Sequence, residues 1–539
     1  MKASILASVL ALAATAAATL HPRNVDLRRS LSKRNIGGLK PRASSKPDSI
    51  VNATFNQLLD HTDPSKGTFK QRYWYNAEHW GGPGYPIFMI NGGEGDASVY
   101  DGYLENGTIM YLYAEKFKGA IVLFEREYLV HGFGGICEAT PFLTVSTTDR
   151  YYGESLPFKT LTAETLQYHN VPQSIYDNVY FAETAKLGFD KKGGANADKS
   201  PWVLIGGSYP GALAAWTSVI APGTFAAYHA SSAVVQAIED FWQFFTPIEQ
   251  ALPRNCSADI KLVVKKVDSI LSKGDKKQVA AMKKEFGLES MTDNGDFAYI
   301  LYQPVIEWAS NETAVFEFCD YIETSASGGK VNKNREKSGV GLDAAWKAYT
   351  AWMHASYNET CAGNKCSWNA NRDAMSPTYL KWERSWRWQL CNEPFGWWHV
   401  GPPKSDGTNI VSSHIRPQHE ERDCDLFFPG TKGFKPAMSE GFTADMFNAW
   451  TKGGWNATYE NVMFVDGEFD PWKSATMSSD YRPGGPSKST EKAPRLVVKG
   501  AGHVPDYYLY PEKAYASVTK KQVEIMGKWL KNWKPKKGH

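Results

Sequence analysis

The sequence feature that most constrains the fold is a short apolar run that meets a glycine-serine turn. Residues 202–205 lead into Gly206-Gly207-Ser208, and a segment of Ala, Leu and Trp with helical character follows. Such a strand–turn–helix unit holds a serine hydroxyl clear of the backbone, where a neighbouring base can deprotonate it. The match to Gly-x-Ser-x-Gly is imperfect, because Pro210 stands where the last glycine is usual. On this stretch alone, a nucleophile elbow and an ordinary glycine-rich turn both remain open.

Length and charge narrow the classes of protein to consider. The 539 residues are too many for a single small core, and they fit about two to four domains or one large α/β domain with a big insertion. The formal net charge of +3 provides no dominant basic field, so we expect no nucleic-acid partner. The 19 Trp residues suit large buried aromatic clusters or an aromatic-lined cleft.

The N-terminal segment has the pattern of a targeting signal. Lys2 precedes an apolar run from Ile5 to Ala18, so residues 1–18 are predicted to be a signal peptide. The run is too short to cross a membrane, and we expect no membrane partner. The protein should be secreted to the cell exterior, with an acidic vacuolar or lysosome-like compartment as the alternative. Residues 19–47 are basic, and Lys33-Arg34 favours a propeptide over a disordered tail.

Secretion agrees with the disulfide and glycosylation signals. The seven cysteines show no zinc spacing with histidines, so disulfides are expected rather than a metal site, and Cys137 is the candidate for the unpaired thiol. The other six, whose pairing stays open on counting alone, are Cys256, Cys319, Cys361, Cys366, Cys391 and Cys424. Asn-x-Ser/Thr sequons predict N-glycosylation at Asn52, Asn106, Asn255, Asn311, Asn358 and Asn456.

The first half of the chain has the periodicities of a parallel sheet covered by helices. Residues 69–74 alternate like a strand, and residues 85–90 and 120–124 are apolar runs typical of buried strands. Residues 162–187 have mostly helical spacing. Strand, helix, strand, elbow and helix in this order predict a doubly wound α/β arrangement. The glycine-rich loop at 91–95 follows an early strand, where this kind of fold has part of its oxyanion hole; a plain tight turn is the alternative.

The character of the chain changes at about residue 240. Helical spacing, lysines, tryptophans and six cysteines fill residues 240–455, which we interpret as an inserted, mainly helical cap domain. The sheet pattern returns at residues 461–465 and 495–499, and an amphipathic helix ends the chain. The predicted α/β domain therefore consists of residues 48–239 and 456–539.

A serine, an aspartate and a histidine each follow a separate predicted strand. Ser208, Asp470 and His503 have the chain order of an α/β-hydrolase triad. The serine needs a base, the histidine can take and return its proton, and the aspartate fixes the imidazole tautomer. Each residue alone is explained by an ordinary loop, but the three together favour a serine hydrolase.

Segments spread from residue 55 to the C-terminus match one known family. They are Phe55–His61, Phe69–Tyr73, Gly92–Gly95, Arg150–Ser155, Gly206–Tyr209, Leu390–Phe395, Gly467–Trp472 and Gly502–His503. In these motifs the chain closely resembles the family of lysosomal Pro-X carboxypeptidase and dipeptidyl-peptidase II, especially its secreted fungal prolyl-peptidase branch. The resemblance implies an α/β-hydrolase fold with a large helical cap inserted after the central strands. It also implies a serine peptidase that cleaves after proline at acid pH, and we expect no cofactor and no metal.

The resemblance implies roles for individual residues. Ser208 would be the nucleophile, Asp470 the orienting acid and His503 the base, with the backbone N–H of Tyr209 in the oxyanion hole. Gly93, in the glycine-rich loop, is our candidate for a second oxyanion residue. Trp472 would line the proline pocket, because an aromatic face suits a flat pyrrolidine ring.

Other candidates for substrate binding are less specific. Trp388 is a cap-side candidate for which packing in the cap core is the alternative, as it is for Trp386 and Phe395. In an exopeptidase, Glu94 or Glu393 could bind a substrate amine. The resemblance also implies the disulfides Cys256–Cys319 and Cys391–Cys424, and we expect Cys361–Cys366 as the third.

One stretch departs from the family pattern. The family runs from a strand ending in Glu directly into His-Arg-Tyr-Tyr-Gly-Glu-Ser, whereas residues 126–149 intervene here and Asp149 stands where the histidine is expected. We interpret this stretch as an unspliced intron in the gene model. A continuous messenger RNA that encodes it would contradict this interpretation, and a translated insertion at the rim of the active site would put activity in doubt.

The leading functional prediction is a secreted peptidase of endo- or tripeptidyl type that acts on proline-containing peptides or proteins at acid pH. A Pro-X carboxypeptidase or dipeptidyl peptidase is an alternative, because these modes differ in how the cap closes the cleft. An esterase or lipase with the same triad, or an inactive hydrolase-fold binding protein, are further alternatives. The protein is expected to be a monomer or a homodimer.

Overall fold

The computed structural model describes residues 49–92, 101–124, 150–152, 155–190, 193–325, 338–367, 381–403 and 409–535; of residues 101 and 381–383 it describes the backbone. The predicted signal peptide and propeptide lie outside the described residues. So do Gly93, Glu94, Cys137 and the stretch 126–149, and their predictions stay predictions.

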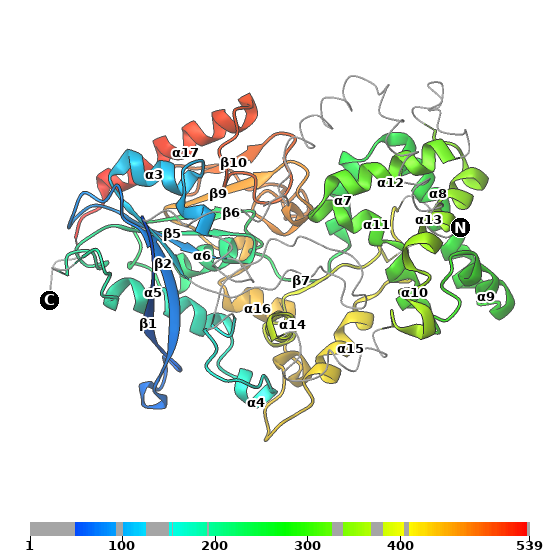
Figure 1. Ribbon diagram of the computed structural model, residues 1–539, viewed down its shortest axis with the longest axis horizontal. Coiled ribbons are helices and arrows are strands. Elements are labelled where there is room, and N and C mark those ends of the chain that lie inside the picture. The colour runs from blue at the N-terminus through cyan, green and yellow to red at the C-terminus, as the bar shows by residue number, and fades with distance from the viewer. Residues whose placement is uncertain are drawn as a thin grey trace.

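A mixed eight-stranded sheet forms the centre of one half of the molecule (Figure 1). Its order is β1-β2-β4-β3-β5-β6-β9-β10, with antiparallel pairing of β1 with β2 and of β2 with β4 and parallel pairing elsewhere. The strands are β1 (Ile50–Leu58), β2 (Thr68–Asn76), β3 (Ile87–Asn91), β4 (Ala120–Phe124), β5 (Trp202–Gly207), β6 (Ala227–Ser231), β9 (Val462–Gly467) and β10 (Arg495–Val498).

Helices cover both faces of the sheet, which explains why its central strands are apolar throughout. Along β3, the side chains of Phe88 and Ile90 pack against one helical layer, and those of Ile87 and Met89 pack against the other. The first layer holds α3 (Ile109–Phe117) and α17 (Lys513–Asn532), and the second holds α5 (Val171–Thr184) and α6 (Tyr209–Ile220). The short helix α4 (Ala163–Leu166) precedes α5 in the chain. The predicted α/β-hydrolase fold is confirmed.

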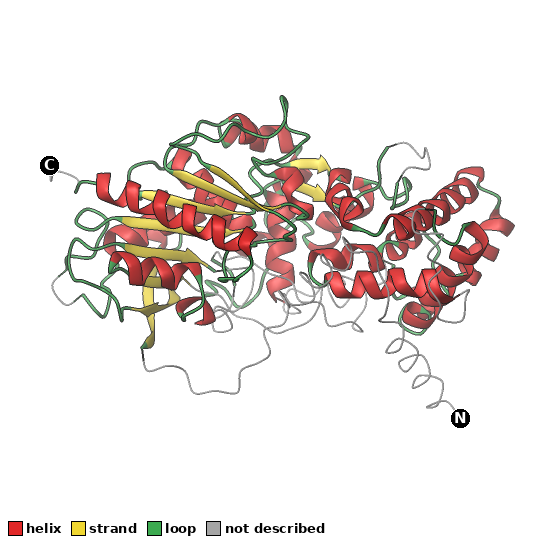
Figure 2. Ribbon diagram, turned by 90° about the horizontal axis from the view of Figure 1, so that it is seen from above, coloured by secondary structure: helices red, strands yellow, loops and turns green. Residues whose placement is uncertain are grey.

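A mainly helical region lies beside the sheet (Figure 2). Two short parallel strands, β7 (Ile238–Asp240) and β8 (Gly396–Trp398), lie at its junction with the sheet half. Its helices are α7 (Phe245–Ala251), α8 (Arg254–Lys273), α9 (Lys276–Glu285), α10 (Asn294–Leu301), α11 (Gln303–Ile306), α12 (Glu312–Ser325), α13 (Leu342–Tyr357), α14 (Lys381–Asn392), α15 (Pro417–Phe427) and α16 (Ala444–Trp450). This is the predicted cap; its domain boundaries stay a prediction.

Short 3-10 helices connect several of these elements. They are η1 (Pro64–Lys66), η3 (Asp101–Leu104), η4 (Trp242–Phe244), η5 (Glu307–Ala309), η7 (Ala362–Asn364), η8 (Ala437–Glu440), η9 (Gly454–Asn456) and η10 (Pro471–Ala475). In the part of the chain that the structure describes, no helix has the length and apolar character needed to span a membrane.

Three disulfides crosslink the cap, and all three expected pairs are present. Cys256–Cys319 joins α8 to α12, Cys391–Cys424 joins α14 to α15, and Cys361–Cys366 closes a short loop. Their Cα atoms lie 5.3, 5.5 and 4.8 Å apart, respectively. The described residues contain no free cysteine.

Residues 162–187, which were expected to be mostly helical, form two helices, α4 and α5. Thr162 caps α4 by accepting a hydrogen bond from the backbone N–H of Thr165. A separate cap, Asn170, begins α5 by accepting from the N–H of Gln173.

Candidate active site

The turn between β5 and α6 has the strained geometry of a nucleophile elbow. Ser208 has φ +66° and ψ −128°, a region that non-glycine residues rarely adopt. Glycine is required on both sides, because a Cβ on Gly206 would lie 2.0 Å from the carbonyl oxygen of Pro210 and one on Gly211 would lie 2.6 Å from that of Ser231. Pro210 is accommodated because it occupies the first turn of α6, where no backbone donor is needed.

Asp470 and His503 come together at the ends of β9 and β10. The Nδ1 atom of His503 donates to Oδ1 of Asp470 over 2.9 Å, and Asp470 is fully buried. The same oxygen accepts the backbone N–H of Trp472 over 2.9 Å, which fixes the carboxylate at the start of η10. The carboxylate thereby favours the tautomer in which Nε2 of His503 is free to act as a base.

The loop that carries His503 is fastened beside the elbow. The N–H of Val504 donates to Oγ of Ser232 over 2.9 Å, while the N–H of Ser208 donates to the carbonyl of Ser231 over 2.8 Å. A Cβ on Gly207 would lie 2.9 Å from the side chain of Val504. Within the described ranges, no hydrogen bond joins the Ser208 hydroxyl to His503; such bonds often form fully only with substrate bound.

Tyr209 follows the serine and is the first residue of α6. Its backbone N–H belongs to the first helical turn, whose donors have no acceptor within the helix and favour negative charge. Its side chain is 1% exposed and points into the cap, where its ring contacts Trp386 and Phe395 at centroid distances of 5.9 and 5.6 Å.

Trp472 belongs to an aromatic wall beside the histidine. Its ring centroid lies 6.3 Å from that of His503, and it is half-buried. The other members, at 5.1 to 6.0 Å from Trp472, are Phe241, Phe244, Trp397 and His399. Burial, helped by Arg387, lowers the pKa of His399 to about 3, so this imidazole is neutral and stacks on Phe244 at 4.0 Å. Sequence reasoning missed the partners of Trp472 because they lie far from it along the chain.

Two further candidates for substrate binding, Trp388 and Glu393, are buried. Trp388 is 1% exposed, donates its indole N–H to the carbonyl of His169 over 3.0 Å and packs on Phe428. Its contacts are therefore those of a packing residue. Glu393 is buried, and its Oε1 accepts from Nδ2 of Asn392 over 2.9 Å.

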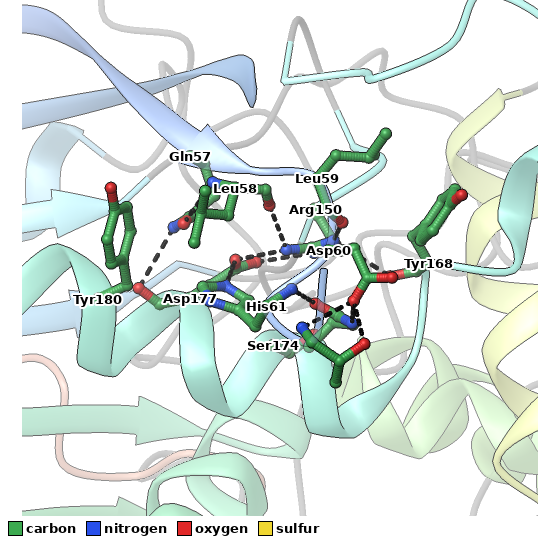
Figure 3. A network of polar contacts seen from close by, with 12 residues as sticks. Gln57, Leu58, Leu59, Asp60, His61, Arg150, Tyr168, Ser174, Asp177 and Tyr180 are labelled. Atoms are coloured by element: carbon green, nitrogen blue, oxygen red, sulfur yellow. Dashed lines mark hydrogen bonds and ion pairs between the residues drawn. The ribbon is translucent and has the colours of Figure 1, made fainter. Parts of the chain in front are cut away.

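The Arg-Tyr-Tyr motif contributes a buried anchor (Figure 3). The guanidinium of Arg150 donates to both carboxylate oxygens of Asp177, over 2.9 and 2.6 Å, and to the carbonyl of Leu58 over 2.8 Å. His61 approaches the same carboxylate within 2.8 Å. These bonds tie the end of β1 to α5 and fix the start of the segment that carries Tyr152.

The predicted sequons all lie in described residues. Asn52, Asn106, Asn311 and Asn456 are exposed, whereas Asn255 and Asn358 are half-buried. Among the residues with described side chains, no cluster of three or more His, Cys, Asp or Glu is arranged to hold a metal.

A family model described as "Serine carboxypeptidase S28" matches residues 57–132 and 140–524. The chain belongs to this family. It is a serine-type peptidase, as predicted. The break in the match, at residues 133–139, falls inside the stretch 126–149 that we interpret as an intron.

Named relatives of this S28 peptidase agree with the assignment. It is 34% identical over 498 residues to "Serine protease vicPb" of Bipolaris victoriae, covering 88% of each chain. It is 26% identical over 501 residues to "Probable extracellular serine carboxypeptidase" of Arthroderma benhamiae, covering 86% of this chain and 64% of the relative. It is 24% identical over 477 residues to "Thymus-specific serine protease" of Homo sapiens, covering 85% and 81%.

Proposed function

We propose that this serine peptidase cleaves on the carboxyl side of proline, at acid pH, through Ser208, His503 and Asp470. The observation that carries the proposal is the double role of one carboxylate oxygen. Oδ1 of Asp470 accepts both from Nδ1 of His503 and from the backbone N–H of Trp472, each over 2.9 Å. The base and the tryptophan of the aromatic wall are thereby held by the same atom.

The reaction follows from these positions. Oγ of Ser208 attacks the proline carbonyl carbon while Nε2 of His503 takes its proton, and the N–H of Tyr209 donates to the resulting oxyanion. His503 passes the proton to the leaving amine, the C–N bond breaks, and the prolyl group stays on Ser208 as an ester. A water molecule deprotonated by His503 hydrolyses the ester and restores the serine.

The aromatic wall supports proline as the residue before the cleaved bond. A pyrrolidine ring is flat and apolar, and it has no polar atom of its own that would need a partner in the pocket. Trp472, which is half-buried, offers an apolar face beside His503, and the fully buried ring of Phe244 packs against Trp472. Larger polar side chains would lose hydration there without compensation.

Buried carboxyls in the cap support operation at acid pH. Burial raises the pKa of Glu420 and of Asp423 to about 7, and that of Glu307 to about 8. At acid pH these groups are protonated, so the folded cap holds fewer buried charges. Secretion is part of the proposal and is supported by the Arthroderma relative, whose name contains the word extracellular.

We favour endo- or tripeptidyl-type cleavage over carboxypeptidase or dipeptidyl cleavage. The family description contains the word carboxypeptidase, which supports carboxypeptidase cleavage as the second candidate. Digestion of a complex peptide mixture at acid pH, read out by mass spectrometry, separates the modes by whether cuts are internal or terminal. We expect cuts after proline that disappear in Ser208→Ala. Cuts spread across all residue types would overturn the specificity.

A further inference from the structure

A glutamine of the cap lies between two buried tyrosine hydroxyls of the hydrolase half. Gln389, on α14, accepts from Oη of Tyr152 over 2.7 Å through Oε1. Its Nε2 donates to Oη of Tyr209 over 3.0 Å. Gln389 and Tyr152 are fully buried, and Tyr209 is 1% exposed. The three side chains form a continuous chain of hydrogen bonds that includes the residue after Ser208.

The chemistry of this position is specific to an amide. Glutamine carries an acceptor and a donor at fixed places on one plane, so it can accept from one hydroxyl while donating to the other. A carboxylate offers acceptors only, and an apolar side chain offers neither. A buried polar group that lacks its hydrogen bond destabilises the folded protein. The hydrogen bond from Gln389 therefore favours one orientation of the Tyr209 side chain.

Helix α14 is itself fixed to the hydrolase half. Oγ of Ser385 donates to the carbonyl of Tyr151 over 2.8 Å, and Nε of Arg384 donates to that of Leu161 over 2.6 Å. Trp388 adds its bond to His169 over 3.0 Å. Helix α14, which carries Gln389 to Tyr209, is therefore hydrogen-bonded to the same chain segment that carries Tyr152.

We propose that Gln389 is a positioning residue through which the seated cap orients Tyr209, and with it the backbone N–H that faces the developing oxyanion. The inference rests on the proposed role of Tyr209. The side chain of Tyr209 is clamped by Gln389 and by the rings of Trp386 and Phe395, and its backbone is one bond from the strained Ser208. Release of this clamp would let Cα of Tyr209 shift, and that shift would move the peptide unit between the two residues.

The experiment compares Gln389→Met and Tyr209→Phe, with Tyr349→Phe as the matched control. Tyr349 donates its buried hydroxyl to the carbonyl of Leu301 over 2.6 Å, in the body of the cap on α13. Loss of the Tyr349 hydroxyl removes a comparable buried hydrogen bond that is not connected to the elbow. The readouts are kcat and KM on a proline-containing peptide, the rate of Ser208 labelling by a fluorophosphonate, and the melting temperature.

We expect Gln389→Met to lower kcat and the labelling rate together by about 10- to 100-fold, the scale of a misplaced catalytic group, with KM nearly unchanged. Tyr209→Phe should do the same, and the double variant should be no worse than either single variant, since both break one chain. Tyr349→Phe should lower the melting temperature alone.

Two results would overturn the inference: rates for Gln389→Met that match the wild type, or losses that track melting temperature in all three variants. The labelling rate does not depend on proline. A wild type that labels at Ser208 but does not cut after proline would therefore refute the proposed specificity while Gln389 is still tested. A wild type that does not label at Ser208 would overturn both.

Discussion

The buried carboxyls of the cap predict a protein that is more stable at acid than at neutral pH, and Glu420 gives the sharpest test. Oε2 of Glu420 lies 3.7 Å from Nη1 of Arg387, which also lies 3.6 Å from Oδ2 of Asp423. Two buried acids thus share Arg387. Burial raises the pKa of Glu420 to about 7, and Arg387 opposes the shift only in part.

The direction and size of the change in unfolding free energy with pH follow from this pKa. As pH rises above the ordinary value of 4.5, the unfolded chain loses the Glu420 proton, whereas the folded protein keeps it until about pH 7. The stability contributed by the protonated acid is complete below pH 4.5 and is lost by about pH 7, a difference of about 3 kcal/mol. Glutamine has the size of the protonated acid but does not ionise.

Urea unfolding of the wild type and of Glu420→Gln, at pH 4.5 and above pH 7, measures this difference. We expect Glu420→Gln to lose about 3 kcal/mol less than the wild type between the two conditions. Glu440→Gln, at an exposed position, is the control and should follow the wild type. A Glu420→Gln protein that loses as much stability as the wild type would refute the reasoning.

Three further substitutions test the site and the cap. Asp470→Asn should lower kcat by about 10⁴-fold, because the imidazole of His503 loses its tautomer partner; steady-state kinetics with an unchanged circular dichroism spectrum checks this. Trp472→Ala should raise KM for proline substrates by about 10-fold or more, whereas Trp472→Phe should keep most of the affinity, as measured on matched proline and alanine peptides. Replacing Cys256 and Cys319 together by serine should lower the unfolding free energy by about 2 to 5 kcal/mol, measured by denaturant unfolding.

The elbow and the two other candidate triad residues could be predicted because each follows a strand. The carboxyl ends of parallel strands meet at one edge of a sheet, so Ser208, Asp470 and His503 were expected near one another despite their separation in sequence. The apolar runs of β3, β4 and β5 were readable for a related reason: helices cover both faces of these strands.

Strand β6 had no such signal. Its residues include His229 and Ser231, which break the apolar pattern although both are fully buried. Both contact Asp506, whose carboxylate accepts from the Ser231 hydroxyl over 2.5 Å and lies 2.7 Å from Nε2 of His229. A partner some 275 residues away cannot be read from local periodicity.

The pocket was harder to predict than the triad for the same reason. Trp472 was singled out through its neighbour Asp470, but Phe244 and His399 approach it only through the packing of η4 and the segment after β8. Trp388, a candidate from the same pattern of tryptophans, packs on Phe428 instead. The number of aromatic residues in a sequence therefore does not show which of them line a binding site and which pack in the core.

During turnover, Ser208 should form an ester with a peptide that ends in proline. Acid quenching of the enzyme during turnover of a proline-containing peptide, followed by proteolysis and mass spectrometry, tests it directly. We expect an acyl group with a C-terminal proline on the fragment that contains Ser208, and none in Ser208→Ala. An acyl group on another residue, or one that ends in residues other than proline, would contradict it.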